Sequence, residues 1–398
     1  MGKIKEKKDM NSDKKKVNFS IDALKDELVA ISQNIYENPE EGLQEFNASK
    51  KLCDYLASHD FEITTPIANL DTAFTASYSN HPDGPVIALL AEYDALPGLG
   101  HACGHNLIGT AAVGAAVALR QSVDFNGTIL VIGCPAEEAG VDGAGGKVVL
   151  VENGCFKSIN LSMIFHPMPL TMVGGETAAL IGLEFRFKGK AAHSAGNPWD
   201  GLNALDGVLQ MYNAINALRQ HVREDVRIHG IITHGGEAPN IVPEYAAARF
   251  FIRSQNNKCL HETIDRVKNC AKGAAISTGT ELEVKTFCNF YESMKSNTVI
   301  NEVYTENLKS LGFWIEGIKK GKGSTDVGNV SRVVPTSELG IRLGHGIVPH
   351  TREFLKAAGS KKGYEVMILG AKILAMSAID FFQSPELLQK AQEEFKKV

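Results

Sequence analysis

Residues that commonly bind metal ions follow three apolar segments of this chain. Thiolate, imidazole and carboxylate donors in one place suit zinc or a neighbouring divalent ion. Ligands in open α/β sheets gather beyond the carboxyl ends of the strands, so we expect the three groups to converge. They are Glu92-Tyr-Asp94 with His101-Ala-Cys103-Gly-His105, then Cys134-Pro-Ala-Glu137-Glu138, and finally Phe165-His166-Pro167.

Cys103 and Cys134 receive different interpretations. Cys134 stands alone on a predicted strand, as an ordinary buried cysteine does. Cys103 is flanked by His101 and His105 at two-residue spacing, and the glycines beside it allow the backbone to approach closely. The pattern therefore favours metal binding for Cys103 and a structural role for Cys134.

Glu137 and Glu138 end an apolar strand, where two carboxylates are costly unless a cation neutralises them. Adjacent residues on a regular strand point to opposite faces, so we expect one carboxylate to bind metal and the other to face water. A bound metal lowers the pKa of its water to about 7, and a free carboxylate can move the proton to the leaving group. This combination predicts metal-assisted hydrolysis.

The segments that carry these residues predict an α/β domain. Apolar runs at 85–91, 128–133 and 161–165 suggest strands buried on both faces, and an Ala- and Gly-rich helix is expected at 107–120. Strands that alternate with helices indicate a mixed, largely parallel sheet flanked by helices.

The pattern changes in the middle of the chain. Segments between 181 and 289 read β-α-β-β-α-β, which predicts a ferredoxin-like α+β domain. We therefore expect a catalytic domain made of residues 17–178 and 296–398, with a lid or dimerisation domain inserted at 179–295. Residues 1–16 carry seven Lys and three acidic residues, which predicts a flexible tail before a helix capped by Ser20.

Composition excludes several classes of protein. The net charge of −5 gives no nucleic-acid footprint, and no run reaches the ~18 apolar residues that a membrane span needs. Seven scattered cysteines without a C-x-x-C pair argue against a disulfide framework and favour a cytoplasmic protein.

Seven motifs in one order carry a resemblance to a known family. As a set they resemble metallopeptidase family M20, which includes aminoacylases, carboxypeptidases and N-acyl-amino-acid amidohydrolases. The chain looks most similar to the amidohydrolase branch, and within it to dipeptidases that act on Xaa-Arg, Xaa-Lys or β-alanyl dipeptides. The motifs are Ala91-Glu-Tyr-Asp-Ala-Leu-Pro97, His101-Ala-Cys-Gly-His105, Cys134-Pro-Ala-Glu-Glu138, Phe165-His-Pro167, Gly189-Lys-Ala-Ala-His193, Pro239-Asn-Ile-Val-Pro243 and Gly323-Ser-Thr-Asp326.

The resemblance implies a centre with two divalent ions, zinc or manganese, with cobalt compatible. Glu137 would be the general base and acid, and Asp94 would be a carboxylate that fixes the site. His350 is favoured over His345 as the C-terminal ligand because the family's ligand lies a few residues before the last long helix. The implied ligands are Cys103, His105, Glu138, His166 and His350.

The resemblance also gives roles to the inserted domain. His193 would polarise the scissile carbonyl, and Asn240 and Arg253 would hold the substrate carboxylate. In the family this domain dimerises, which implies a homodimer or higher homo-oligomer in which some groups serve the neighbouring subunit. One departure is Glu92, because the peptidase branches carry a histidine in that position.

The leading hypothesis is a metal-dependent hydrolase of a small amide, a dipeptide or an N-acyl amino acid. One alternative is a hydrolase that uses Cys103 as its nucleophile with His105, and another is a non-catalytic metal- or ligand-binding protein. A nucleotide site at Gly143-Ala-Gly145-Gly146 lacks the full glycine pattern after a strand. That turn is expected to shape a loop or to begin the next helix.

Overall fold

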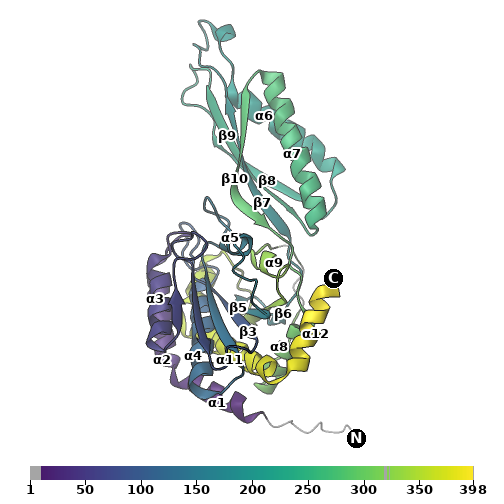
Figure 1. Ribbon diagram of the computed structural model, residues 1–398. Coiled ribbons are helices and arrows are strands. Elements are labelled where there is room, and N and C mark those ends of the chain that lie inside the picture. Colours follow the sequence, from purple (N-terminus) through teal and green to yellow (C-terminus); the bar gives the residue numbers. More distant parts are fainter. Residues whose placement is uncertain (1–9, 318–320, 322, 398) are drawn as a thin grey trace.

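Two bodies of unequal size make up the protein (Figure 1). The computed structural model describes residues 10–317, 321 and 323–397. The larger body contains a seven-stranded sheet, and the smaller one, drawn in green and teal, contains a four-stranded sheet. No helix of these described residues is long and apolar enough to cross a membrane.

The larger sheet has the strand order β1-β2-β4-β3-β5-β11-β6. Its centre is parallel, because β3 pairs in parallel with β4 and β5, and β5 pairs in parallel with β11. Antiparallel strands complete both edges, which confirms the predicted mixed, largely parallel sheet. The strands are β1 (Glu62–Thr64), β2 (Phe74–Ser79), β3 (Val86–Glu92), β4 (Thr128–Cys134), β5 (Leu161–Met168), β6 (Met172–Val173) and β11 (Thr336–Arg342).

Both faces of this sheet are covered, which explains the continuous apolar runs. On β3, Leu89 packs into the core under the long helices, whereas Leu90 packs into a second core on the other face. Helices α1, α2, α3, α4 and α11 belong to the first core, and α5 and α9 belong to the second. The helices of this body are α1 (Ser12–Ala23), α2 (Lys25–Glu37), α3 (Phe46–Ser58), α4 (His105–Ser122), α5 (Gly146–Glu152), α8 (Thr298–Ser310), α9 (Val327–Val330), α10 (Arg352–Ala358), α11 (Lys361–Gln383) and α12 (Pro385–Lys397).

The smaller body has the predicted β-α-β-β-α-β order. Its antiparallel sheet runs β10-β7-β9-β8, and α6 and α7 cover one face with their own hydrophobic core. The predicted ferredoxin-like arrangement is confirmed. Its elements are β7 (Ala179–Lys188), α6 (Ala204–Leu218), β8 (Arg227–His234), β9 (Tyr245–Ser254), α7 (Asn257–Thr278) and β10 (Glu281–Tyr291), with short 3-10 turns at Pro198–Asp200 and Arg219–His221.

The N-terminal prediction needs correction. Helix α1 begins at Ser12, inside the predicted tail, and the Asn11 side chain caps it by accepting from Asp13 N. Val17 is fully buried on this helix, so the last residues of the predicted tail, from Ser12, belong to the fold. The helix expected to start at Ser20 is split at Leu24 into α1 and α2. The rest of the predicted tail, residues 1–9, lies outside the described residues.

Candidate metal centre

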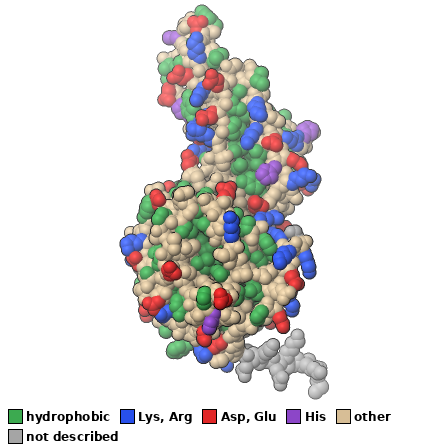
Figure 2. Space-filling model, viewed as in Figure 1, with side chains coloured by type: hydrophobic (Ala, Val, Ile, Leu, Met, Phe, Trp, Pro, Cys, Tyr) green, Lys and Arg blue, Asp and Glu red, His purple; other side chains and the backbone are tan. Residues whose placement is uncertain are grey.

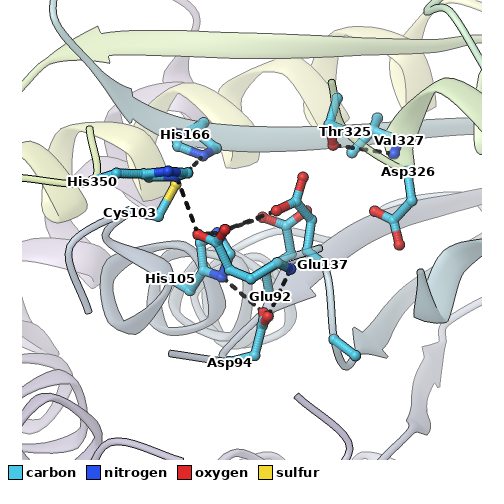
Figure 3. A network of polar contacts seen from close by, with 12 residues as sticks. Glu92, Asp94, Cys103, His105, Glu137, His166, Thr325, Asp326, Val327 and His350 are labelled. Atoms are coloured by element: carbon cyan, nitrogen blue, oxygen red, sulfur yellow. Dashed lines mark hydrogen bonds and ion pairs between the residues drawn. The ribbon is translucent and has the colours of Figure 1, made fainter. Parts of the chain in front are cut away.

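The three groups of predicted ligands meet at the carboxyl end of the parallel strands (Figure 3). Four groups of three donors have their ligand atoms within 4.8 Å of one another. Three of these groups consist of predicted ligands and the predicted base. They are Cys103–His105–His166, Cys103–Glu138–His350 and His105–Glu137–Glu138, and the fourth is Glu92–Glu137–Asp326.

His105 is the first residue of α4 and is held by Asp94. Its Nδ1 lies 2.8 Å from Asp94 Oδ1, and the other oxygen of Asp94 accepts from Glu138 N at 2.9 Å. Burial lowers the pKa of His105, but Asp94 and Cys103 together outweigh it and raise that pKa well above the ordinary value. A carboxylate on one ring nitrogen leaves the other, Nε2, aimed at the centre, as in carboxylate–histidine–metal arrangements.

Cys103 and His166 face each other across the centre. His166 Nδ1 donates to the Pro167 carbonyl at 2.8 Å, so in the neutral ring Nε2 carries a lone pair. That Nε2 lies 3.6 Å from Cys103 Sγ. Burial and the Glu138 carboxylate raise the pKa of the Cys103 thiol well above its usual value.

Glu137 and Glu138 lie differently from the expectation. They follow β4 on a loop in which Ala136 has a positive φ of 53°, so strand alternation does not apply to them. His105 Nε2 is 3.9 Å from Glu137 Oε2 and also 3.9 Å from Glu138 Oε1. Both carboxylates therefore enter the centre, with Glu138 grouped on the Cys103 side and Glu137 on the Asp326 side.

His350, rather than His345, joins the described donor groups. Its Nε2 lies 3.5 Å from Glu138 Oε1, and its backbone N–H donates to the Ala102 carbonyl at 2.9 Å. The residue has φ of 66°, an uncommon conformation for a histidine. Its side chain is 55% exposed, so it lies on the solvent side of the centre.

Three buried charged residues lie beside Glu137, and the sequence did not predict that they would meet. Lys147 Nζ is 2.7 Å from Glu92 Oε1 and 2.6 Å from Asp326 Oδ1, and all three side chains are buried. Burial lowers the pKa of Lys147, but the two carboxylates outweigh it and raise that pKa well above the ordinary value. Asp326 ends the motif Gly323-Ser-Thr-Asp326, and Glu92 stands where the peptidase branches of the family have a histidine. Lys147 belongs to no motif, so nothing in the sequence predicted its place here.

The predicted base has an unusual environment. Burial, with the charges of Glu92 and Glu138, raises the pKa of Glu137 well above its usual value. The Tyr291 hydroxyl, at the end of β10, donates to the Glu137 carbonyl at 2.7 Å. This contact ties the loop of Glu137 to the smaller body, and the sequence analysis did not identify it.

The predicted residues of the smaller body occupy two different places. Arg253, at the end of β9, donates to Ser324 Oγ of the larger body at 2.9 Å. Its register partner is Leu180, and Leu180 also pairs with Tyr291. This end of the small sheet therefore adjoins the catalytic body.

His193 and Asn240 lie beyond the opposite end of the same sheet. The strands there pair Lys188 with Tyr245, and His193 forms an isolated bridge with Ile241. Eight residues of extended strand separate Tyr245 from Arg253, which is roughly 26 Å. A single chain therefore does not bring Asn240 to Arg253, nor His193 to Glu137.

Comparisons with known proteins give the family. The peptidase dimerisation domain of family M20 matches residues 176–278. An Xaa-Arg dipeptidase of Homo sapiens is 36% identical over 94% of this chain and 90% of its own length. A chain of the p-aminobenzoyl-glutamate hydrolase of Escherichia coli is 30% identical over 96% of this chain and 94% of its own length.

The chain belongs to metallopeptidase family M20. The resemblance predicted from the seven motifs is therefore confirmed, as is the class of metal-dependent hydrolase acting on amide or peptide bonds. A solved M20 structure from Bacillus subtilis, described as a dinuclear metal-binding peptidase, has the same fold, with a TM-score of 0.67 and 21% identity over 91% of this chain and 99% of its own. The roles of individual residues and the identity of the metal remain predictions.

Proposed function

We propose that this chain hydrolyses the amide bond of a dipeptide or an N-acyl amino acid. The observation that carries the proposal is a set of buried donors without hydrogen-bond partners. His105 Nε2 and Glu138 Oε1 are buried and make no hydrogen bond within the described part of the chain. Buried polar atoms normally have a partner, so these two suit a cation. We propose that Cys103, His105, Glu138, His166 and His350 hold two divalent ions.

The donor set fits such ions in chemistry as well as position. Sulfur and imidazole suit zinc, and a carboxylate also suits manganese, so either metal is compatible. When bound, the ions would supply a water of lowered pKa and polarise the substrate carbonyl. Asp94 would keep the His105 ring oriented, because its two oxygens hold both His105 and the Glu138 backbone.

In the proposed reaction, Glu137 moves the proton. We assign the Glu137 carboxylate to no ion. It is grouped with Glu92 and Asp326, and the Glu137 backbone contacts Tyr291 of the smaller body. Glu137 would take a proton from the attacking water and pass it to the leaving nitrogen.

His193 would donate a hydrogen bond to the developing oxyanion. The backbone N–H groups of Ala195 and Gly196 donate to His193 Nδ1 at 3.2 and 3.0 Å. In the neutral ring, these bonds leave the proton on Nε2, which is the donor that an oxyanion needs. The His193 residue is exposed, so its ring could contact a substrate bound to another subunit.

The separation of these groups supports a homodimer whose active site uses both subunits. Arg253 adjoins the catalytic body of its own chain, whereas His193 and Asn240 lie beyond the other end of the sheet, past Tyr245, which is roughly 26 Å from Arg253 along β9. We propose that His193 and Asn240 serve the partner's site, where Asn240 would meet Arg253 at the substrate carboxylate. Strand β8 is one of the two edge strands of the small sheet and carries Ile231 at 66% exposure, which supports pairing of this edge with another chain.

The substrate class follows from what the relatives share. The names Xaa-Arg dipeptidase and p-aminobenzoyl-glutamate hydrolase both describe an amide whose leaving part is an amino acid. We propose the same class here, with a free carboxylate held by Arg253 and Asn240. Acidic and basic side chains are interspersed on the face shown in Figure 2, so the proposed partners are small molecules rather than nucleic acid. All seven cysteines are free, which supports a cytoplasmic location.

The first test uses the protein reloaded with zinc or manganese and a panel of dipeptides and N-acyl amino acids. Glu137→Gln is expected to retain metal while kcat falls by about 10²–10⁴-fold. Amidating the substrate's terminal carboxylate is expected to raise KM strongly. Near-normal turnover by Glu137→Gln with metal bound would contradict the proposal.

The second test mixes two inactive variants. Glu137→Gln and His193→Ala are expected to be inactive alone. After subunit exchange between equal amounts, about half of the dimers are mixed, and one of the two sites in each mixed dimer contains both intact residues. The mixture should therefore recover about a quarter of wild-type activity. No recovery, with subunit exchange demonstrated, would place His193 in the service of its own chain.

A further inference from the structure

A buried lysine lies in a place where a metal ion could bind. Carboxylate oxygens of Glu92, Glu137 and Asp326 lie within 4.8 Å of one another, which is a donor group suited to a divalent ion. Lys147 Nζ lies 2.7 Å from Glu92 and 2.6 Å from Asp326. An ammonium therefore already occupies this cation position.

Lys147 is fixed there by its backbone as well as its side chain. Asp326 Oδ2 accepts from Lys147 N at 2.9 Å, and Oδ1 of the same carboxylate accepts from Nζ. Asp326 is the residue before α9, so it positions the beginning of α5 against α9. The lysine has 0% exposure, so water cannot replace its two ionic partners.

The same segment is attached to the loop of the predicted base. Gly145 N donates to the Ala136 carbonyl at 2.7 Å, and Gly145 has φ of 103°, a conformation that favours glycine. A Cβ on Gly146 would lie 2.1 Å from the Pro135 carbonyl oxygen, so only glycine allows α5 to begin this close to the loop. The glycine-rich turn thus places Lys147 next to Glu137.

We propose that Lys147 is a positioning residue that confines divalent metal to the Cys103 side of the centre and leaves Glu137 without a metal ligand role. Without the ammonium, the three carboxylates would attract an additional ion, and Glu137 would coordinate it instead of moving a proton. This inference rests on the proposed metal-dependent hydrolysis, because it concerns the base of that reaction.

The test counts bound manganese, since a site made only of carboxylate oxygens suits that ion. Wild type, Lys147→Met and the double variant Lys147→Met/Asp326→Asn are loaded with Mn²⁺, freed of excess, and analysed for metal per protomer and for kcat. Lys147→Met is expected to bind one more ion than wild type, with kcat reduced by at least about 100-fold. Its melting temperature is expected to depend on Mn²⁺ more strongly than that of wild type.

The double variant separates metal exclusion from a simple structural role. It has the same local charge as wild type but one carboxylate fewer, so it is expected to lose the extra ion and recover kcat to within tenfold of wild type. Wild-type metal content in a folded Lys147→Met, or a double variant as inactive as the single one, would overturn the proposal. So would failure of both variants to fold even with Mn²⁺, because the role would then be structural.

Failure of the proposed function would look different. In that case wild type itself would bind no Mn²⁺ or would show no metal-dependent hydrolysis. If only the inference about Lys147 fails, wild type remains an active metal-binding enzyme and the lysine variants gain no ion.

Discussion

Two clusters of side chains that include buried carboxylates lie next to each other at the carboxyl end of the parallel strands, and their partners differ. In one cluster, His105 Nε2 and Glu138 Oε1 have no hydrogen-bond partner within the described residues. In the other, Glu92 and Asp326 are both paired with Lys147. We propose that the first cluster binds a cation from solution, whereas the second contains the ammonium of Lys147.

Glu45 shows a third solution in the same region. It accepts hydrogen bonds from Ala136 N and from the Thr72 hydroxyl, each at 2.8 Å. Burial, together with the charge of Asp94, raises the pKa of Glu45 to about 7. The buried carboxylates of this region therefore have different surroundings: Lys147 pairs with Glu92 and Asp326, hydrogen bonds and a raised pKa characterise Glu45, and we propose a bound cation beside Glu138.

The largest effect is expected from removing a donor of the first cluster, the one that contains His105 and Glu138. Cys103→Ser should weaken metal binding by more than about 100-fold, since mutating even a residue that only hydrogen-bonds to a metal ligand typically weakens binding about 10–100-fold. Activity should fall with it. Cys134→Ser is the control, because Cys134 is also buried but contacts the Ile132 carbonyl and belongs to none of the donor groups found among the described residues. Metal titration by calorimetry checks both, and equal affinities in the two variants would contradict the assignment.

Removing the titratable proton of Glu45 should change the pH dependence of stability. Its folded pKa of about 7 lies above the ordinary value of 4.5, so its stabilising contribution is complete below pH 4.5 and is lost as pH rises through 7. Glu45→Gln should therefore gain about 3 kcal/mol relative to wild type between pH 4.5 and 8. Urea unfolding of the metal-free proteins measures this gain. The exposed Glu41→Gln is the control, and parallel curves for Glu45→Gln and wild type would show that Glu45 is ionised in the fold.

A smaller effect is expected from Asp94→Asn, which keeps the size of the side chain but removes its charge. His105 loses the carboxylate that orients its ring, so metal affinity should fall about 10–100-fold while the fold persists. Competition with a chelator measures the affinity. Unchanged affinity would mean that packing alone orients His105.

The smallest effect is expected far from both clusters, on α1. Lys14 Nζ contacts Asp380 Oδ2 at 2.6 Å and Asn307 Oδ1 at 2.8 Å, in a partly exposed pair. Lys14→Ala should cost about 1 kcal/mol or less, with no change in metal binding. Lys16→Ala is the control, because Lys16 pairs only within its own helix. Equal losses in thermal unfolding would mean that the contact to α11 adds nothing.

Much of the fold followed from local patterns. The apolar run at 85–91 predicted a strand buried on both faces, and β3 has one core on each face. The β-α-β-β-α-β order predicted the second sheet for the same reason, because alternation and helical periodicity are local properties. The prediction of a tail up to residue 16 was wrong because residues 12–16 are polar and give no local helix signal. They belong to a helix in which Val17 packs into the core.

The family, the two-domain pattern and the side chains that follow the strands could be predicted from the amino-acid sequence, because motifs and strand ends consist of adjacent residues. How those side chains are divided into groups follows from the folded arrangement. It brought Lys147 to Glu92 and Asp326, placed both Glu137 and Glu138 in the centre, and separated Asn240 from Arg253. Pairing of charges and distance along a strand depend on which distant segments meet, and no local pattern of residue types encodes that.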